Sequence, residues 1–253
     1  MMGRYTENRE FLKANFQVLD EIETDIKKGL PSPSYQKKYS MEKLIDLPEV
    51  TKEIQKKSNV FDCINDRRSI RNYSNEYITL DQLSYLLWAT QGIQEVVEKS
   101  KTTRRRVPSG GAVHPFETYL IINRVSELES GIYRYLPLEH KLIFINFVKD
   151  ISTTIDKATP RQPFVQNFVS KSAVIFAWSC IPYRAEYKFD ITAHKKILID
   201  IGHVCQNLYI GAEAVGCGAC AIGIYDQKLI DEMLNLDGDD EFVIYMAALG
   251  KRK

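Results

Sequence analysis

The sequence lacks a charge excess of either sign. Its 253 residues include 34 Lys and Arg against 33 Asp and Glu, which gives a formal net charge of +1. A protein that binds nucleic acid by neutralising phosphates needs a clear basic excess. The run from Lys99 to Arg106 holds five basic residues in eight but no interleaved aromatic residue, so we expect no nucleic-acid role.

Long apolar runs are also missing. Residues Met1 to Glu7 contain no apolar stretch of signal-peptide length. The run from Leu208 to Tyr225 carries Glu213 as its only charge, but four glycines interrupt it, and Gly216 is expected to separate a helix end from a strand. We therefore expect no membrane span and a cytoplasmic protein.

Cysteine is scarce, with five residues in the chain. In the absence of a secretory signal, an odd number of cysteines indicates reduced thiols. Cys217 and Cys220 have CxxC spacing, but no second Cys or His pair supplies the remaining ligands of a zinc site, so no metal is expected. We interpret this pair as core-packed, with redox or metal chemistry as the alternative.

The signatures of several enzyme classes are absent. The sequence has no serine nucleophile elbow, no His-Glu-x-x-His, no phosphate loop ending in Gly-Lys-Ser/Thr and no Gly-x-Gly-x-x-Gly turn. Nothing therefore indicates a hydrolase. Without a Rossmann fingerprint, a nicotinamide nucleotide could visit only as a passing substrate.

The apolar patterns predict an α+β protein with helices packed around a central sheet. A Thr79–Gln82 capping box opens an amphipathic helix that ends at Gly92. A long helix is expected over His194–Val215, with Ile197, Leu198, Ile201, Val204, Leu208 and Ala212 facing inward. A short helix is expected over Lys228–Leu234, and strands over Thr118–Ile122, Ile132–Tyr135, Leu142–Phe147, Ala173–Trp178, Cys220–Ile224 and Phe242–Leu249, with a turn at Pro137–His140.

The N-terminal region is poor in long apolar runs. A helical spacing covers Arg9–Lys28, including Phe11, Phe16 and Ile22, and is followed by Gly29 and a Pro-Ser-Pro-Ser stretch expected to be extended. This region cannot bury a core alone. We expect residues 1–60 to form an arm that packs on the core or on a partner, and residues 61–253 to form one domain.

Three local features indicate a ligand. Arg67 and Arg71 are four residues apart and can face one anion, with Ser69 adding a hydroxyl, although a solvated basic turn is the alternative. Adjacent glycines between Pro108 and Pro115 suit backbone approach to a planar ligand or a plain surface turn. Small residues over Gly216–Gly223 would let a flat ligand lie against a strand, or let a helix pack closely. His114 is interpreted as a packed histidine.

Taken in order, five stretches resemble the FMN-dependent nitroreductase superfamily, and within it the SagB-type and thiazoline-oxidase-like dehydrogenases. They are Arg67–Tyr73, Leu83–Ile93, Arg106–Pro115, Gly202–Leu208 and Ala221–Asp226, and the similarity runs from about Phe61 to Gly250. The resemblance implies a nitroreductase-like fold with a mostly antiparallel central sheet. It also implies that residues 61–253 bind FMN and that a homodimer holds two FMN sites at its interface.

The resemblance further assigns cofactor contacts residue by residue. It implies that Arg67, Arg68 and Ser69 hold the FMN phosphate and ribityl chain, with Lys251 and Arg252 adding to the phosphate shell. It implies that Arg71 approaches the flavin pyrimidine, and that Gly223 and Ile224 present backbone N–H groups to the hydride-accepting nitrogen and the neighbouring carbonyl. The partner subunit is expected to meet the ring with its loop, formed by Pro108, Ser109, Gly110, Gly111 and Ala112. No side chain is assigned as a general base, because the flavin carries the chemistry.

The expected activity is NAD(P)H-driven two-electron transfer to a small oxidised acceptor such as a nitroaromatic, a quinone or a flavin. An azoline dehydrogenase acting on a modified peptide and a non-catalytic flavin-binding protein are the alternatives. Ala112 and His114 depart from residues common in relatives. Lys188-Phe189 occupies the register of a Lys-Tyr pair in azoline-oxidising relatives, and Phe189 lacks the hydroxyl. Lys188 stays a candidate substrate-side cation, with a solvated lysine as the alternative.

Overall fold

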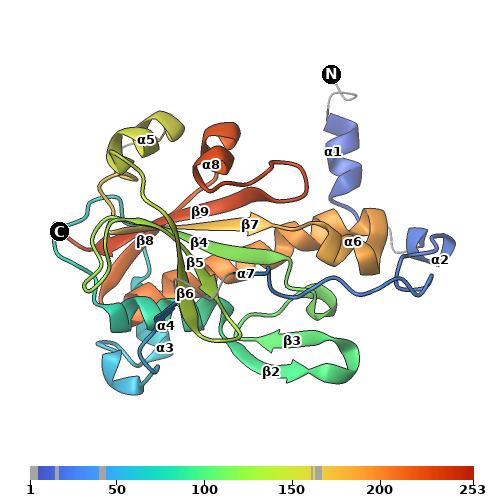
Figure 1. Cartoon of the computed structure of the whole chain (residues 1–253), viewed down its shortest axis with the longest axis horizontal. Helices are drawn as coiled ribbons and strands as arrows, with labels where there is room; N and C mark the ends of the chain where they lie inside the picture. The colour runs from blue at the N-terminus through green and yellow to red at the C-terminus, as the bar shows by residue number, and fades with distance from the viewer. Residues whose placement is uncertain (1–4, 15–16, 40–43, 161, 163–166) are drawn as a thin grey trace.

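A seven-stranded sheet forms the centre of the structure (Figure 1). The computed structural model describes residues 5–14, 17–39, 44–160, 162 and 167–253. Every neighbouring pair in the sheet is antiparallel, in the order β1-β6-β5-β4-β7-β9-β8. The strands are β1 (Leu44–Asp46), β4 (Phe116–Ile122), β5 (Gly131–Leu136), β6 (Lys141–Asn146), β7 (Val174–Cys180), β8 (Cys217–Ile222) and β9 (Phe242–Lys251).

Helices cover both faces of the sheet. The helices α4 (Leu80–Gln91) and α7 (Ala193–Ala214) pack on one face, and α5 (Ile151–Ala158) and α8 (Gln227–Met233) on the other (Figure 1). Successive residues of a strand point to opposite faces. In β4, Leu120 packs in the α4–α7 cluster and Ile121 in the α5–α8 cluster. The α+β architecture predicted from the sequence is therefore confirmed.

The strongest local signals are also confirmed. The Thr79 hydroxyl accepts a hydrogen bond from Gln82 N at 3.2 Å, and the Gln82 side chain accepts one from Thr79 N at 3.1 Å, so α4 begins with a complete capping box. The continuous apolar run predicted as a strand is β7, which is buried along its whole length. One inward residue was predicted wrongly, because Leu198 on α7 is 50% exposed.

The single helix predicted over Arg9–Lys28 is wrong. Two short helices occupy this region, α1 (Thr6–Phe11) and α2 (Val18–Glu21), and Ile22 is extended. Residues 15–16, including Phe16, lie outside the described residues. Because Phe11 and Leu12 are exposed, no tertiary packing stabilises a longer helix there, and short isolated helices are marginal in water.

The boundaries of β8 differ from the prediction. α7 ends at Ala214 and is followed by Gly216, whose φ of +71° only glycine adopts easily, and pairing with β9 begins at once with Cys217 opposite Lys251. The strand ends at Ile222, so Gly223 and Ile224 lie past it. Cys217 packs in the α4–α7 cluster and Cys220 in the α5–α8 cluster, on opposite faces, which confirms core packing. No described helix is long and apolar enough to cross a membrane.

Several elements were not predicted. The helix α3 (Val60–Asp66) precedes the basic segment, and α6 (Tyr183–Phe189) follows β7. A separate two-stranded hairpin, β2 (Ile93–Val97) and β3 (Thr102–Arg105), includes most of the basic run. Short 3₁₀ turns lie at Lys52–Ile54, Glu98–Ser100, Gly110–Ala112 and Asp190–Thr192. Arg105 is buried and donates to Gln91 Oε1 at 2.7 Å, so this run does not form one exposed basic face.

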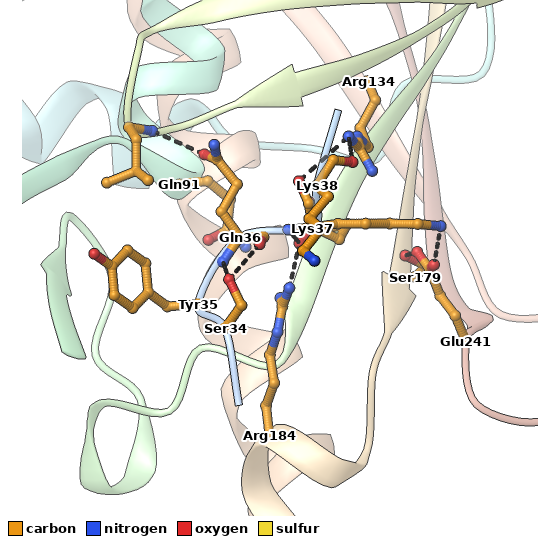
Figure 2. A network of polar contacts seen from close by, with 12 residues as sticks. Ser34, Tyr35, Gln36, Lys37, Lys38, Gln91, Arg134, Ser179, Arg184 and Glu241 are labelled. Atoms are coloured by element: carbon orange, nitrogen blue, oxygen red, sulfur yellow. Dashed lines mark hydrogen bonds and ion pairs between the residues drawn. The ribbon is translucent and has the colours of Figure 1, made fainter. Parts of the chain in front are cut away.

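Part of the N-terminal region is anchored to the sheet by buried charges (Figure 2). Lys37 forms an ion pair with Glu241, which also accepts from Ser179 Oγ at 2.6 Å. Lys37 N donates to Glu117 Oε1 at 2.9 Å, and Arg184 Nη2 donates to the same oxygen at 2.6 Å. The strand β1 extends the sheet beside β6. Residues before position 60 are therefore bonded to the core of their own chain.

His114 is buried in the fold, and His140 is half-buried. Both ring nitrogens of His140 lie 2.8 Å from hydroxyls, those of Ser84 and Tyr135, and burial lowers the pKa of His140. Burial, reinforced by the nearby charge of Arg105, lowers the pKa of His114 from 6.5 to about 3. The interpretation of His114 as a packed histidine is confirmed, since only 4% of the surface of His114 is exposed.

Replacing Lys37 should destabilise the fold. Lys37→Met leaves the buried Glu241 carboxylate without its cation, and we expect a loss of about 1–3 kcal/mol in the free energy of unfolding, measured by urea denaturation. Lys38→Met is the matched control, because the Lys38 side chain is exposed, and should change stability by less than about 0.5 kcal/mol. Equal effects of the two variants would contradict this role.

Stability should fall as pH drops below about 6.5. Between 6.5 and about 3, the unfolded state protonates His114 and the folded state does not, so the unfolded state binds more protons and is favoured as pH falls. Above pH 6.5 the imidazole of His114 is neutral in both states, so its protonation no longer lowers the free energy of unfolding. We expect His114→Gln to remove on the order of 1–2 kcal/mol of the stability difference between about pH 7 and about pH 5. An unchanged difference in urea denaturation would refute the assignment.

Candidate functional site

The basic segment after α3 lies beside β8. Ile70 N donates to Ala219 O at 2.9 Å, and Ser69 forms a parallel bridge with Ala219. Ser69 Oγ lies 3.2 Å from the hydroxyl of Tyr209 on α7, and that hydroxyl accepts from Ala221 N at 2.7 Å. Tyr209 was not singled out from the sequence, although it bonds to both the segment and the strand.

The arginines of this segment are available to an anion. The Arg67 guanidinium carbon lies 5.3 Å from the Tyr209 ring centroid, and Arg68 Nη1 donates to the carbonyls of Asn65 and Arg67 at 2.9 and 2.7 Å. Within the described parts of the chain, no carboxylate forms an ion pair with Arg67 or Arg68. Arg71 lies over the Phe168 ring at 5.9 Å. Guanidinium groups match phosphate oxygens in geometry.

The end of β8 offers open space. A Cβ atom added at Gly223 would have no neighbour within 4 Å, and Ile224 is 60% exposed. The carbonyl of Ile224 accepts from Gln162 Nε2 at 2.7 Å. Gly223 lies four residues beyond Ala219, or about 13 Å along an extended chain. The basic segment therefore meets β8 at Ala219, and the open strand end lies about 13 Å further along the chain.

The loop Pro108–Ala112 is held by a buried carboxylate on α7. Asp200 accepts from Ser109 Oγ at 2.6 Å and from Gly110 N at 3.0 Å. Asp200 is 4% exposed, and burial raises its pKa even though both hydrogen bonds act to lower it. It was not singled out from the sequence. The sequence feature that could have identified Asp200 is its position as an acidic residue on the apolar stripe formed by Ile197, Ile201 and Val204.

The loop adopts unusual backbone conformations. Gly111 has φ +64° and Ala112 φ +55°, and a Cβ at Gly111 would lie 2.6 Å from the Phe189 ring. Only glycine fits this close approach. Lys188 Nζ donates to Gly111 O at 3.0 Å, so the Lys188–Phe189 pair contacts the loop directly. Non-glycine residues in the left-handed region are typical of functional sites.

One chain does not bring the loop to the basic segment. Their anchors, Asp200 and Tyr209, are nine residues apart on α7, or about 13 Å along the helix axis. Lys251 and Arg252 have partners within the chain, because Lys251 Nζ donates to Gln82 Oε1 at 2.7 Å and Arg252 pairs with Glu213. Glu213 is buried and also lies 3.5 Å from Lys57 Nζ.

The sequence is similar to a known protein family and to individual relatives. Residues 64–251 match the model of the Nitroreductase family. A nitroreductase-family protein of Methanocaldococcus jannaschii is 26% identical over 208 residues, covering 82% of this chain and 96% of the relative. The trifolitoxin-processing protein of Rhizobium leguminosarum biovar trifolii is 23% identical over 165 residues, covering 63% of this chain and 44% of that protein.

Solved structures share the architecture. A nitroreductase-family structure from Ralstonia eutropha has a TM-score of 0.66 and 21% identity, covering 88% of this chain and 95% of that one. The microcin synthetase complex of Escherichia coli has a TM-score of 0.61 and 15% identity, covering 94% of this chain and 81% of that one. The nitroreductase-like fold is therefore confirmed, and the sequence is distantly similar to the trifolitoxin-processing protein. The family match spans most of the chain, including Arg67–Arg71, the Pro108–Ala112 loop and β8, and the chain belongs to the nitroreductase family.

Proposed function

We propose that this protein binds FMN and transfers an electron pair from a reduced nicotinamide nucleotide to a small oxidised acceptor. The observation that carries the proposal is the juxtaposition of Arg67–Arg71 with β8, fixed by the 2.9 Å bond from Ile70 N to Ala219 O. The guanidinium groups of Arg67 and Arg68, which form no ion pair among the described residues, thus lie beside β8, and the open backbone of Gly223 follows the end of that strand. A flat molecule with a phosphate tail matches both features.

The residues present fit FMN. Arg67, Arg68 and Ser69 would hold the phosphate and ribityl chain, since they combine charge with a hydroxyl and are partly or fully exposed. The empty space next to Gly223 leaves room for a planar ring against the backbone. When bound, FMN accepts and donates a hydride equivalent.

The chain itself supplies position and electrostatics. Arg71 would place positive charge at the pyrimidine side of the ring, where reduction leaves anionic charge, and a fixed cation in a partly dry pocket stabilises that charge. The backbone N–H groups of Gly223 and Ile224 would orient the ring without adding a competing acid. Lys251 and Arg252 would contribute only long-range charge, because both are engaged with Gln82 and Glu213.

The ring side of the site would be completed by a second copy of the chain. The loop Pro108–Ala112 is fixed to Asp200, about 13 Å along α7 from Tyr209, and so covers a different part of its own chain. In a homodimer, this loop would meet the ring bound by the partner. The apolar side chains of Leu198 and Ile199 on α7 are about half exposed and suit such a contact.

A second candidate is an azoline dehydrogenase that acts on a modified peptide. It is favoured by the homology to the trifolitoxin-processing protein. Against it stands Phe189, whose ring packs beneath Gly111 and has no hydroxyl to handle a substrate proton. We therefore favour a small acceptor over a peptide azoline.

Removing the phosphate contacts should weaken cofactor binding. We expect Arg67→Ala combined with Ser69→Ala to lower the affinity for FMN by about 10- to 100-fold, measured by quenching of flavin fluorescence, because charge-assisted hydrogen bonds are lost. Arg104→Ala is the control, since Arg104 pairs with Glu95 on the hairpin. Protein that is colourless and takes up no added FMN would overturn the proposal.

Anaerobic titration separates the candidate activities. We expect NADH or NADPH to bleach the visible flavin absorbance, and a nitroaromatic or quinone to restore it, without any peptide present. Bleaching by an azoline peptide without nicotinamide would favour the peptide reaction. A bound flavin that no donor bleaches would indicate a non-catalytic flavin-binding protein.

A further inference from the structure

A cavity of about 290 Å³ lies where four segments of the chain meet. Its walls are the arm around Ser32–Tyr35, the turn of the β2–β3 hairpin at Lys99–Thr102, the Gly111–Val113 loop, and α6. This volume is at the lower end of the range for small-molecule sites, roughly 300–1,000 Å³. The cavity borders the loop that is proposed to meet the flavin ring, but it involves none of the residues assigned to the phosphate.

The charged lining of this cavity is entirely basic. Lys99, Lys101, Arg184 and Lys188 line it, and no lining residue is acidic. Arg184 is neutralised by Glu117 at 2.6 Å. Across the described residues, no carboxylate forms an ion pair with any of the three lysines, and the Lys188 ammonium donates to Gly111 O instead. Three uncompensated cations around one cavity favour an anion.

Arg184 adds a second, independent indication. Its side chain is 3% exposed, and its Nη1 is buried without a hydrogen-bond partner among the described residues. A buried donor left unsatisfied costs about 1–3 kcal/mol, and most such donors in proteins are paired. Since Arg184 lines the cavity, a ligand that carries acceptor oxygens would relieve this penalty.

The rest of the lining indicates an organic anion rather than an inorganic one. Apolar and aromatic side chains contribute to the cavity from the arm, the loop and α6, namely Ile26, Pro33, Tyr35, Val113 and Tyr187. An apolar body would pack against these side chains while its anionic end faces the lysines. A free phosphate or sulfate would leave that apolar surface unused.

We propose that this cavity selects electron acceptors that carry a carboxylate on an apolar or aromatic body. This inference deepens the proposed function and rests on it, because the cavity gains a catalytic meaning only from the flavin beside the loop. Lys99 and Lys101 at the hairpin turn attract the carboxylate. Lys188 donates a hydrogen bond to the loop at Gly111 O and adds a third positive charge to the cavity wall. The three lysines are specificity-determining residues and take no part in the hydride transfer.

The test compares two probes of similar shape, 4-nitrobenzoate and neutral 4-nitrobenzamide. Each turnover takes one hydride from the nicotinamide and one proton from solvent, converts the nitro group to nitroso and releases water. We expect the natural chain to show a kcat/KM about three- to tenfold higher for the anion, arising mainly in KM, as expected for partly screened charges.

The preference should depend on the lysines of the hairpin turn. Lys99→Gln combined with Lys101→Gln should bring the two kcat/KM values together while leaving that for 4-nitrobenzamide unchanged, and Lys188→Gln should act in the same direction. Lys157→Gln with Lys228→Gln removes the same charge from exposed positions on α5 and α8, on the other face of the sheet, and should keep the preference. If this control lost the preference for 4-nitrobenzoate to the same extent, the site would be overturned, and the net charge of the protein would explain the preference.

A binding measurement keeps this inference separate from the flavin chemistry. Calorimetric titration of the protein with 4-nitrobenzoate, in the presence and absence of FMN, should show binding that weakens with salt and with the Lys99/Lys101 change. Binding without turnover would refute the proposed function and leave the anion site standing. The acceptor site would be refuted if 4-nitrobenzoate did not bind. It would also be refuted if the Lys99/Lys101 change weakened only the use of NADPH relative to NADH, because the lysines would then bind the nucleotide and not the acceptor.

Discussion

Three polar side chains on one helix fix the positions of the segments that form the site. Asp200, Tyr209 and Glu213 lie along α7, and each bonds to a different segment. Asp200 holds the Ser109–Gly110 loop, Tyr209 joins Ser69 to β8, and Glu213 pairs with Lys57 and Arg252. Because α7 is packed in the core through Ile197, Ile201, Val204 and Leu208, these anchors cannot shift without disrupting the fold.

Buried charge has a second role at the other end of the sheet. Glu117 and Glu241 are almost fully buried and receive Arg184 and Lys37, the first from α6 and the second from the N-terminal arm (Figure 2). A buried carboxylate that loses its cation is strongly unfavourable. The arm is therefore needed by the core, and it also supplies one wall of the basic cavity. Although the chain is nearly neutral as a whole, it places cations that form no ion pair among the described residues at two sites, Arg67 and Arg68 after α3 and Lys99 and Lys101 in the hairpin turn.

The Gly111 loop is held from two sides. It is bonded to Asp200 on one side and to Lys188 on the other, and the Phe189 ring fills the space beneath it. Phe189 supports the loop with its ring and has no hydroxyl, so this position supplies a packing contact and no proton-handling group.

The sequence by itself determined the elements whose signals are local. The capping box at Thr79, the apolar run of β7 and the inward stripe of α7 each identify one element, because hydrogen bonding within a turn and burial on both faces leave a periodic pattern. The order of the short motifs was sufficient to predict the family and the Arg67–Ser69 segment. Only the tertiary structure decided the rest. The pattern over Arg9–Lys28 is helical, yet Phe11 and Leu12 are exposed, and Gly223 lies beyond a strand whose end depends on pairing with β9. Asp200, Tyr209 and the lysines of the cavity acquire their roles from partners up to 140 residues away, and no local pattern records such contacts.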